Sequence, residues 1–105
     1  MGASTPENRV KSSIKDALMK DQWMVQANLQ TGFMPKEFRG RPDFEAYKDG
    51  KVLFIEVKAK NGKQSYYQKE YQKKLEEHGM IYVLARSVSD IEPYLTTVQS
   101  LFPGS

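Results

Sequence analysis

The 105-residue chain contains no cysteine and one histidine, and none of its apolar runs approaches the length of a membrane-spanning helix. The absence of cysteine excludes disulfides and thiolate metal sites, and one histidine is too few for an ordinary zinc site. A transmembrane helix needs about 20 mostly apolar residues, so we expect no membrane segment. No signal-peptide pattern is present, so the default expectation is a cytoplasmic protein, in the host cytoplasm if a phage encodes it.

The net charge is only +3, and its distribution is more informative than its size. Lysines gather between residues 58 and 74, and Arg39 and Arg41 lie shortly before them. Clustered bases suit a polyanion such as nucleic acid, although the lysines taken alone are more typical of a solvated helix face. The length predicts a single domain over residues 1–105 with one modest core.

Hydrophobic periodicity predicts an α/β domain in the order helix, strand, strand, strand, helix, strand, helix. The expected elements are a helix from Ser4-Thr5, a strand over 23–29, a loop over 30–41, a hairpin over 44–47 and 52–59, a helix over 65–78, a strand over 80–85 and a last helix from Ser87. The nearly all-apolar strand MIYVLA (80–85) indicates a buried central position, parallel to a neighbour because it follows a helical crossover. The last helix should bury a stripe of Ile91, Leu95, Val98 and Leu101. Helices would then flank a mixed sheet.

The hairpin brings acidic residues together. A two-residue turn at Asp49-Gly50 fixes the register, so that Asp43 falls opposite Glu56 with their β-carbons about 5 Å apart. Lys58 lies two residues further along the same face. The apolar residues of both strands fall on the other face: Phe44, Ala46, Leu53, Ile55 and Val57. One short strand can therefore contribute to the core and to a polar site.

Two carboxylates at this separation repel each other, so they need a shared proton or a neighbouring cation. Lys58 supplies one positive charge, and a divalent cation supplies more, because Mg²⁺ is commonly held by one or two carboxylates with water and substrate phosphate. Pro42 lacks a backbone donor, which marks a place where strand pairing can end. The alternative is an exposed Glu56–Lys58 ion pair worth less than about 1 kcal/mol. Pro42-Asp43 at the matching register favours the metal site.

Pro42-Asp43 followed by Glu56-Val57-Lys58 resembles the motif of the PD-(D/E)XK nuclease superfamily. A wider run resembles the virus-type replication-repair nuclease (VRR-NUC) family: Gly40-Arg41-Pro42-Asp43, Ile55-Glu56-Val57-Lys58, Gly62, Ser65, Gln68, Leu75, Gly79 and Ala85-Arg86-Ser87. The resemblance covers roughly residues 5–90, and its full run is more specific than the core triplet. It implies a restriction-endonuclease-like fold, which is a mixed β-sheet flanked by helices, in agreement with the element order.

The resemblance also implies roles for individual residues. Asp43 and Glu56 would bind Mg²⁺ or Mn²⁺, with help from the backbone carbonyl of Val57. Lys58 would orient or deprotonate the attacking water and stabilise charge on the phosphate. Gln68 matches a helical glutamine that supports the metal shell or contacts the nucleic-acid backbone. Without the resemblance, Gln68 would be interpreted as a helix-surface amide.

Glu7 matches a glutamate that the family carries on its first helix, and its position supports two interpretations. It shares a helical face with Val10, Ile14 and Leu18, which places its carboxylate at the inner side or rim of the helix, where it can join a metal shell. It is also a first-turn acid, suited to the helix dipole or to a capping box. Both interpretations stay open.

The expected function is a Mg²⁺-dependent DNA endonuclease. The resemblance implies a homodimer that cuts branched DNA such as four-way (Holliday) junctions. Candidate nucleic-acid contacts are Lys36, Arg39, Arg41, Lys60, Lys63, Ser65 and Lys69. The alternatives are a nuclease for flap or linear DNA, a non-catalytic DNA-binding module on the same fold, and a small interaction protein with incidental charges.

Aromatic and apolar residues leave two further questions open. Three tyrosines of the second helix are able to stack on bases, but packing in the core or at its rim is more usual: Tyr66, Tyr67 and Tyr71. Three loop residues suit either a dimer interface or anchoring of their loop in the core: Phe33, Met34 and Phe38.

Overall fold

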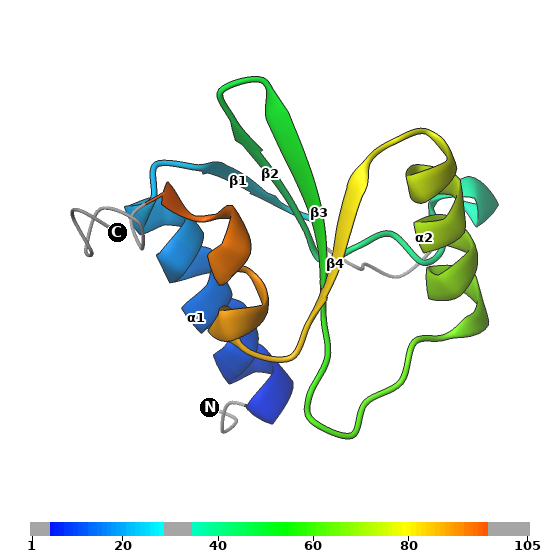
Figure 1. The fold of residues 1–105 in the computed structure, drawn as a ribbon. Helices are drawn as coiled ribbons and strands as arrows, with labels where there is room; N and C mark the ends of the chain where they lie inside the picture. Colours follow the sequence, from blue (N-terminus) through cyan, green and yellow to red (C-terminus); the bar gives the residue numbers. More distant parts are fainter. Residues whose placement is uncertain (1–4, 29–34, 97–105) are drawn as a thin grey trace.

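A mixed β-sheet stands between helices in this computed structural model, which describes residues 5–28 and 35–96 (Figure 1). The described elements are α1 (Pro6–Lys20), β1 (Met24–Ala27), the 3-10 turn η1 (Lys36–Phe38), β2 (Phe44–Lys48), β3 (Lys51–Val57), α2 (Tyr66–Glu77), β4 (Ile81–Ala85) and the 3-10 turns η2 (Val88–Asp90) and η3 (Glu92–Tyr94). The expected α/β class is confirmed. No helix in these two ranges is long and apolar enough to cross a membrane.

The described strands form one sheet in the order β1-β2-β3-β4. The first three strands are antiparallel and β4 runs parallel to β3, as its helical crossover predicted. The prediction of a central position for β4 is wrong, because β4 pairs with β3 alone and lies at the edge of this sheet. Its apolar sequence reflects coverage of its two faces, where Tyr82, Val83 and Ala85 are buried.

The β2–β3 hairpin forms in the predicted register. Asp49 and Gly50 both have positive φ, 50° and 77°, which is the requirement of a type I′ turn. Lys48 pairs with Lys51, and the ladder continues as far as Phe44 opposite Ile55. The five apolar residues predicted for one face are all buried: Phe44, Ala46, Leu53, Ile55 and Val57.

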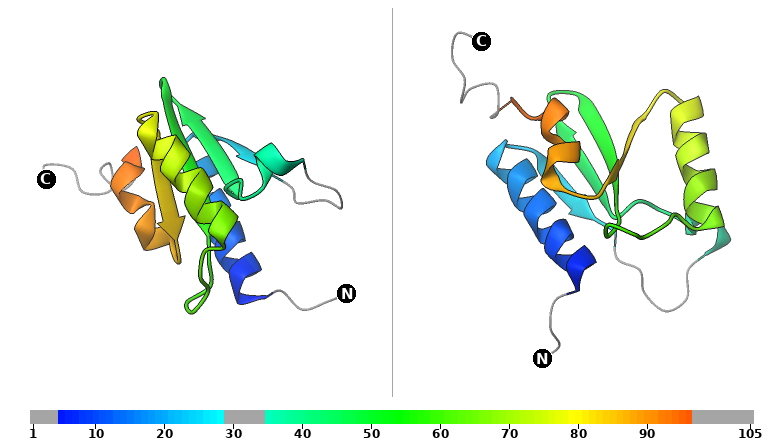
Figure 2. Two further views of the ribbon diagram at one scale, coloured as in Figure 1. Left: turned by 90° about the vertical axis from the view of Figure 1, so that its right-hand side faces the viewer. Right: turned by 60° about the horizontal axis from the view of Figure 1, so that its bottom comes forward.

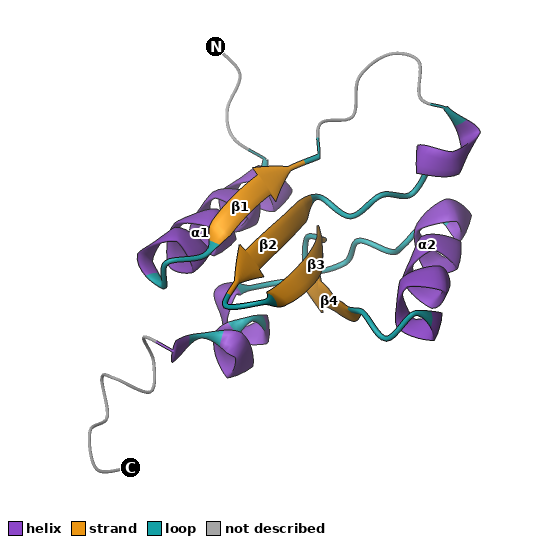
Figure 3. Ribbon diagram, turned by 90° about the horizontal axis from the view of Figure 1, so that it is seen from above, coloured by secondary structure: helices purple, strands orange, loops and turns teal. Residues whose placement is uncertain are grey.

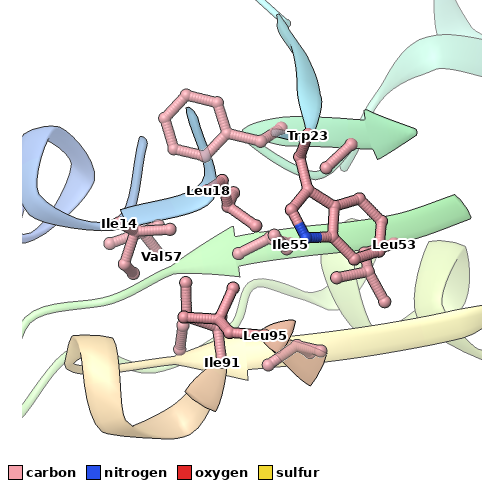
Figure 4. Close-up of a cluster of buried hydrophobic side chains, with 12 residues drawn as sticks. Ile14, Leu18, Trp23, Leu53, Ile55, Val57, Ile91 and Leu95 are labelled. Atoms are coloured by element: carbon pink, nitrogen blue, oxygen red, sulfur yellow. The ribbon is translucent and has the colours of Figure 1, made fainter. Parts of the chain in front are cut away.

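The main core lies between this face of the sheet, α1 and the C-terminal turns (Figure 4). Thr5 caps α1, since its hydroxyl accepts from the backbone N–H of Asn8 at 3.0 Å. Ile14 and Leu18 are fully buried on the inner stripe of the helix. They pack in one cluster with the β3 residues and with Ile91. This packing fixes the position of α1 relative to the end of β3.

Over residues 88–94 the predicted C-terminal helix is replaced by η2 and η3, and helical structure resumes at Thr96. Ile91 and Leu95 are buried as expected, whereas Val98 and Leu101 lie outside the described residues. The physical reason is Pro93, which lacks an N–H donor and clashes with the carbonyl four residues earlier in an α-helix. Strand β1 is also shorter than predicted: it ends at Ala27, and Leu29 is not described.

Helix α2 covers the opposite side of the sheet from α1 (Figure 2). It begins and ends where the sequence predicted, with Ser65 as its N-cap, His78 as its C-cap and Gly79 in the left-handed region at φ 76°. None of its residues is buried, in contrast to Ile14 and Leu18 of α1. The residues of α2 are therefore at most half-buried.

Candidate active site

Asp43 lies where the β2–β3 ladder ends. Pairing stops at Phe44 and Ile55, one residue short of the predicted Asp43–Glu56 pair. The N–H of Val57 instead donates to Oδ2 of the Asp43 carboxylate at 2.7 Å. Asn28 donates from Nδ2 to the carbonyl of Pro42 at 2.9 Å, which turns that carbonyl toward β1. The Asp43 carboxylate has thus taken the place of the Pro42 carbonyl as the acceptor for Val57, and this exchange places the carboxylate at the end of β3.

Glu56 is the most deeply buried acid of this region, with 2% of its surface exposed. Its Oε2 accepts from Nε2 of Gln68 at 2.9 Å and lies 3.8 Å from Nζ of Lys58. Its Oε1 is buried and has no hydrogen-bond donor within the described ranges. A buried carboxylate oxygen without a donor is costly, because burial removes the water that solvates the charge and no hydrogen bond replaces it.

The environment of Glu56 raises its pKa from 4.5 to about 8. Burial is the largest cause, the charge of Asp43 adds to it, and Lys58 opposes it. Two ionised carboxylates are both acceptors, so a hydrogen bond between Asp43 and Glu56 requires a proton on one of them. Either that proton or a cation can therefore satisfy the pair.

Lys11 is part of this site, although it was not among the residues predicted from the sequence. Its Nζ lies 3.2 Å from Oδ1 of Asp43 and 3.6 Å from Oε2 of Glu7. Burial alone would lower the pKa of Lys11, but Asp43 and then Glu7 outweigh that effect, so the pKa is raised. Its spacing from Glu7, four residues along one helical face, was the available signal.

Glu7 is linked to the site through Lys11, which pairs with both Glu7 and Asp43. In the part of the chain that the structure describes, no three acidic, histidine or cysteine side chains come close enough to hold a metal ion together. Glu7 therefore does not join Asp43 and Glu56 in a three-carboxylate group in this conformation. The first-turn position is as predicted, since Glu7 is the acid of that turn of α1.

Gln68 has two structural roles. It forms a capping box with Ser65, whose N–H donates to Oε1 of Gln68 at 2.8 Å while the Ser65 hydroxyl accepts from the N–H of Gln68 at 3.2 Å. The remaining amide nitrogen donates to Glu56. One side chain therefore starts α2 and orients a site carboxylate.

The predicted nucleic-acid contacts fall into different environments. The Nη2 of Arg41 donates to Oδ1 of Asn28 at 2.6 Å and lies 3.5 Å from Oε2 of Glu45. Its guanidinium is therefore paired with groups of the protein itself. Arg39 stacks on Tyr67. The lysines and the serine of this set are exposed: Lys36, Lys60, Lys63, Ser65 and Lys69. Lys60 and Lys63 belong to the turn that directly follows the site strand.

Arg86 holds the backbone turn that follows Lys58. Its Nη1 donates to the carbonyls of Ala59 and Gly62 at 2.7 and 2.8 Å. The turn follows β3 directly, so Arg86 steadies the chain between Lys58 and α2. Of the loop residues considered for an interface, Phe38 is 42% exposed and lies under the guanidinium of Arg41, while Phe33 and Met34 lie outside the described residues. Phe38 is therefore not anchored in the core.

The donor set suits a hard divalent cation. Asp43 and Glu56 supply carboxylate oxygens, and Oε1 of Glu56 is a buried acceptor without a donor in the described ranges. Mg²⁺ is usually bound by one or two protein carboxylates, with waters completing its octahedron. The missing third carboxylate is therefore compatible with Mg²⁺ or Mn²⁺.

Comparison with known proteins identifies a similar fold. A solved structure described as "VRR_NUC domain" superposes with a TM-score of 0.71, covers 86% of this chain and 94% of its own, and is 22% identical in sequence. No family model matches the sequence, and no curated protein matches it. At this identity the likeness concerns the fold, and it confirms the VRR-NUC-like fold expected from the sequence.

Proposed function

We propose that this protein is a metal-dependent nuclease of the PD-(D/E)XK type that hydrolyses phosphodiester bonds in DNA. The observation that carries the proposal is the buried Glu56 with the half-buried Asp43 and Lys58 beside it. A carboxylate with 2% exposure, a raised pKa and an oxygen without a described donor is costly for a small domain, and such perturbed groups cluster at functional sites. The VRR-NUC-like fold supports the same chemistry.

Asp43 and Glu56 would hold Mg²⁺ or Mn²⁺, together with the backbone carbonyl of Val57. When bound, the cation would lower the pKa of a water and neutralise charge on the scissile phosphate. Gln68 keeps Oε2 of Glu56 in place, so that Oε1 is presented to the site. The Val57 N–H likewise holds Oδ2 of Asp43 in place.

Lys58 supplies the remaining charge. Its ammonium group lies beside Glu56 and can donate to the attacking water or to a phosphate oxygen. The water oxygen bonds to phosphorus, the bond from phosphorus to the 3′ oxygen breaks, and that oxygen takes up a proton. The products are a 5′-phosphate and a 3′-hydroxyl. Arg86 supports this step indirectly, because it fixes the turn after Lys58.

Branched DNA, including four-way junctions, and a homodimeric assembly are the finer parts of the proposal, and they rest on the resemblance to VRR-NUC proteins. The exposed Lys60 and Lys63 support a nucleic-acid substrate, since they follow the site strand and are free to contact phosphates. A non-catalytic DNA-binding module is the second candidate. It would need the basic side chains but not the acid pair.

The test is cleavage of labelled four-way junction, flap, linear duplex and single-stranded DNA with Mg²⁺, Mn²⁺ or EDTA. We expect metal-dependent cuts that Glu56→Gln and Lys58→Ala abolish. Glu92→Gln and Lys51→Ala are the matched controls, because both residues are exposed and lie outside the site. A wild type that binds but never cuts supports the binding module, and equal cutting by Glu56→Gln refutes the assignment of the site.

A further inference from the structure

A groove lies between η1 and α2, which are neighbours in space (Figure 3). Its volume is about 630 Å³, within the range of about 300 to 1,000 Å³ that small-molecule pockets occupy. Three tyrosines and three cations line much of it: Tyr66, Tyr67, Tyr71, Lys36, Arg39 and Lys74. The proposed hydrolysis uses none of them.

The tyrosines are not part of the core. Tyr66 is 71% exposed and Tyr67 is 43% exposed, and no residue of α2 is buried. Large exposed aromatic side chains that gather on one surface commonly mark a binding site. Packing therefore does not explain why α2 begins with two adjacent tyrosines.

The rings are arranged so that one face stays available. Tyr66 meets Tyr67 edge to face, with centroids 5.5 Å apart and planes at 78°. The guanidinium of Arg39 lies 5.5 Å from the centroid of Tyr67, and its Nη1 donates to the Tyr67 hydroxyl at 3.4 Å. Tyr67 is thus supported by both neighbours, while Tyr66 presents its ring to solvent. A flat π-system can stack there at little cost in ordering.

The charge of the groove and its position favour a polyanion. Lys36, Arg39 and Lys74 outnumber the two carboxylates that line the groove, Glu37 and Glu70. The groove also adjoins the proposed active site through α2: Tyr67 lines the groove, and the next residue along the chain contacts the site carboxylate. A nucleic-acid strand with a phosphate at the Asp43–Glu56 pair can therefore continue into the groove.

We propose that the groove between η1 and α2 binds unpaired nucleobases of a DNA strand that continues from the Asp43–Glu56 pair, with Tyr66 as the stacking platform. A groove of this size accepts single bases but not a duplex. The inference rests on the proposed nuclease function and narrows it: among branched substrates, those with a single-stranded stretch beside the scissile phosphate, such as flaps, would be preferred to fully paired four-way junctions. Fully paired DNA would leave the groove empty.

The experiment measures binding rather than cleavage, so that it does not depend on the chemistry. Fluorescence anisotropy in EDTA would compare a labelled oligothymidylate with a blunt duplex, for the wild type, Tyr66→Ala and Tyr66→Phe. Tyr94→Ala is the matched control, because Tyr94 is 37% exposed in η3, on the other side of the sheet. Stacking of one base on an aromatic side chain contributes about 1–3 kcal/mol, so Tyr66→Ala should weaken oligothymidylate binding roughly 5- to 150-fold.

Tyr66→Phe and Tyr94→Ala should bind like the wild type, because the first keeps the ring and the second lies elsewhere. Unchanged binding by Tyr66→Ala overturns the inference, as does an equal loss of duplex binding. A wild-type dimer in sedimentation that Tyr66→Ala converts to a monomer also overturns it, because a second copy would then occupy the groove. If the wild type cuts nothing but Tyr66→Ala loses oligothymidylate binding, the groove assignment stands and the nuclease proposal fails.

Discussion

Replacing Glu56 with glutamine should make the metal-free protein more resistant to unfolding at alkaline pH. Glu56 has a pKa of about 8 in the folded protein against an ordinary value of 4.5. Each pH unit of difference corresponds to about 1.4 kcal/mol, so full ionisation costs the fold at most about 5 kcal/mol. Glutamine is neutral, keeps an acceptor for Gln68 and can donate from its amide to Asp43. Glutamine therefore removes the free-energy cost of ionisation without creating a cavity.

The sign follows from proton linkage. Below pH 4.5 the carboxyl is protonated in both states, and its contribution to stability is fully present. Between 4.5 and about 8 the folded state holds the proton more tightly than the unfolded chain, so stability falls as the pH rises. Above about 8 the loss is complete. Wild type and Glu56→Gln should therefore have similar stability below pH 4.5, diverge between pH 4.5 and about 8, and keep a constant difference above that.

Urea unfolding in EDTA, followed by fluorescence of the single, buried Trp23, measures this divergence across the pH range. Glu92→Gln is the control, because it removes an exposed carboxylate and should leave the pH profile unchanged. Adding Mg²⁺ should stabilise the wild type at alkaline pH but not Glu56→Gln, since the cation binds the ionised pair. Parallel pH profiles for wild type and Glu56→Gln would refute the account of the site.

Two other substitutions test the surroundings of the pair. Lys11→Met should tighten Mg²⁺ binding several-fold in calorimetry, because the ammonium group no longer competes for Asp43 and such ion pairs contribute up to about 1 kcal/mol. Lys15→Met, on the exposed face of the same helix, is the control. Unchanged affinity in Lys11→Met would contradict this role. Gly40→Ala should lower the urea midpoint of unfolding far more than Gly50→Ala. Both glycines have positive φ, so the backbone strain is shared. An added β-carbon at Gly40 would stand 2.2 Å from a carbonyl oxygen in the first turn of α2, whereas at Gly50 it would meet no atom within 4 Å. Equal midpoints would show that this close approach does not matter.

The parts of the fold that depend on local chemistry could be predicted from the sequence. Asp49-Gly50 fixes a type I′ turn, and strict alternation then decides which residues of β2 and β3 face the core. Ser65 and Gln68 form a capping box within four residues, so the start of α2 is also a local property. Each of these features needs only neighbours in the chain.

The features that were missed depend on neighbours distant in the chain. The edge position of β4 cannot be distinguished from a central one by composition, since coverage of both faces selects the same apolar residues. Lys11 enters the site only because α1 crosses the end of β3. Arg41 was predicted to contact a phosphate, but its guanidinium donates to Asn28 at the end of β1. In each case the deciding contact is tertiary.

The attachment of α2 joins the acidic pair to the groove. None of the residues of α2 is buried, and polar and backbone contacts help to hold the helix on its side of the sheet. Gln68 bonds to Glu56, Gln64 donates to the hydroxyl of Tyr82 at 3.1 Å, and Gly40 packs closely on the backbone of Tyr67. The carboxylate that would bind a cation is thus also an anchor of the helix that carries the tyrosines. A change in the charge of Glu56 acts on this anchor directly, so the acidic pair and the groove are expected to behave as one site.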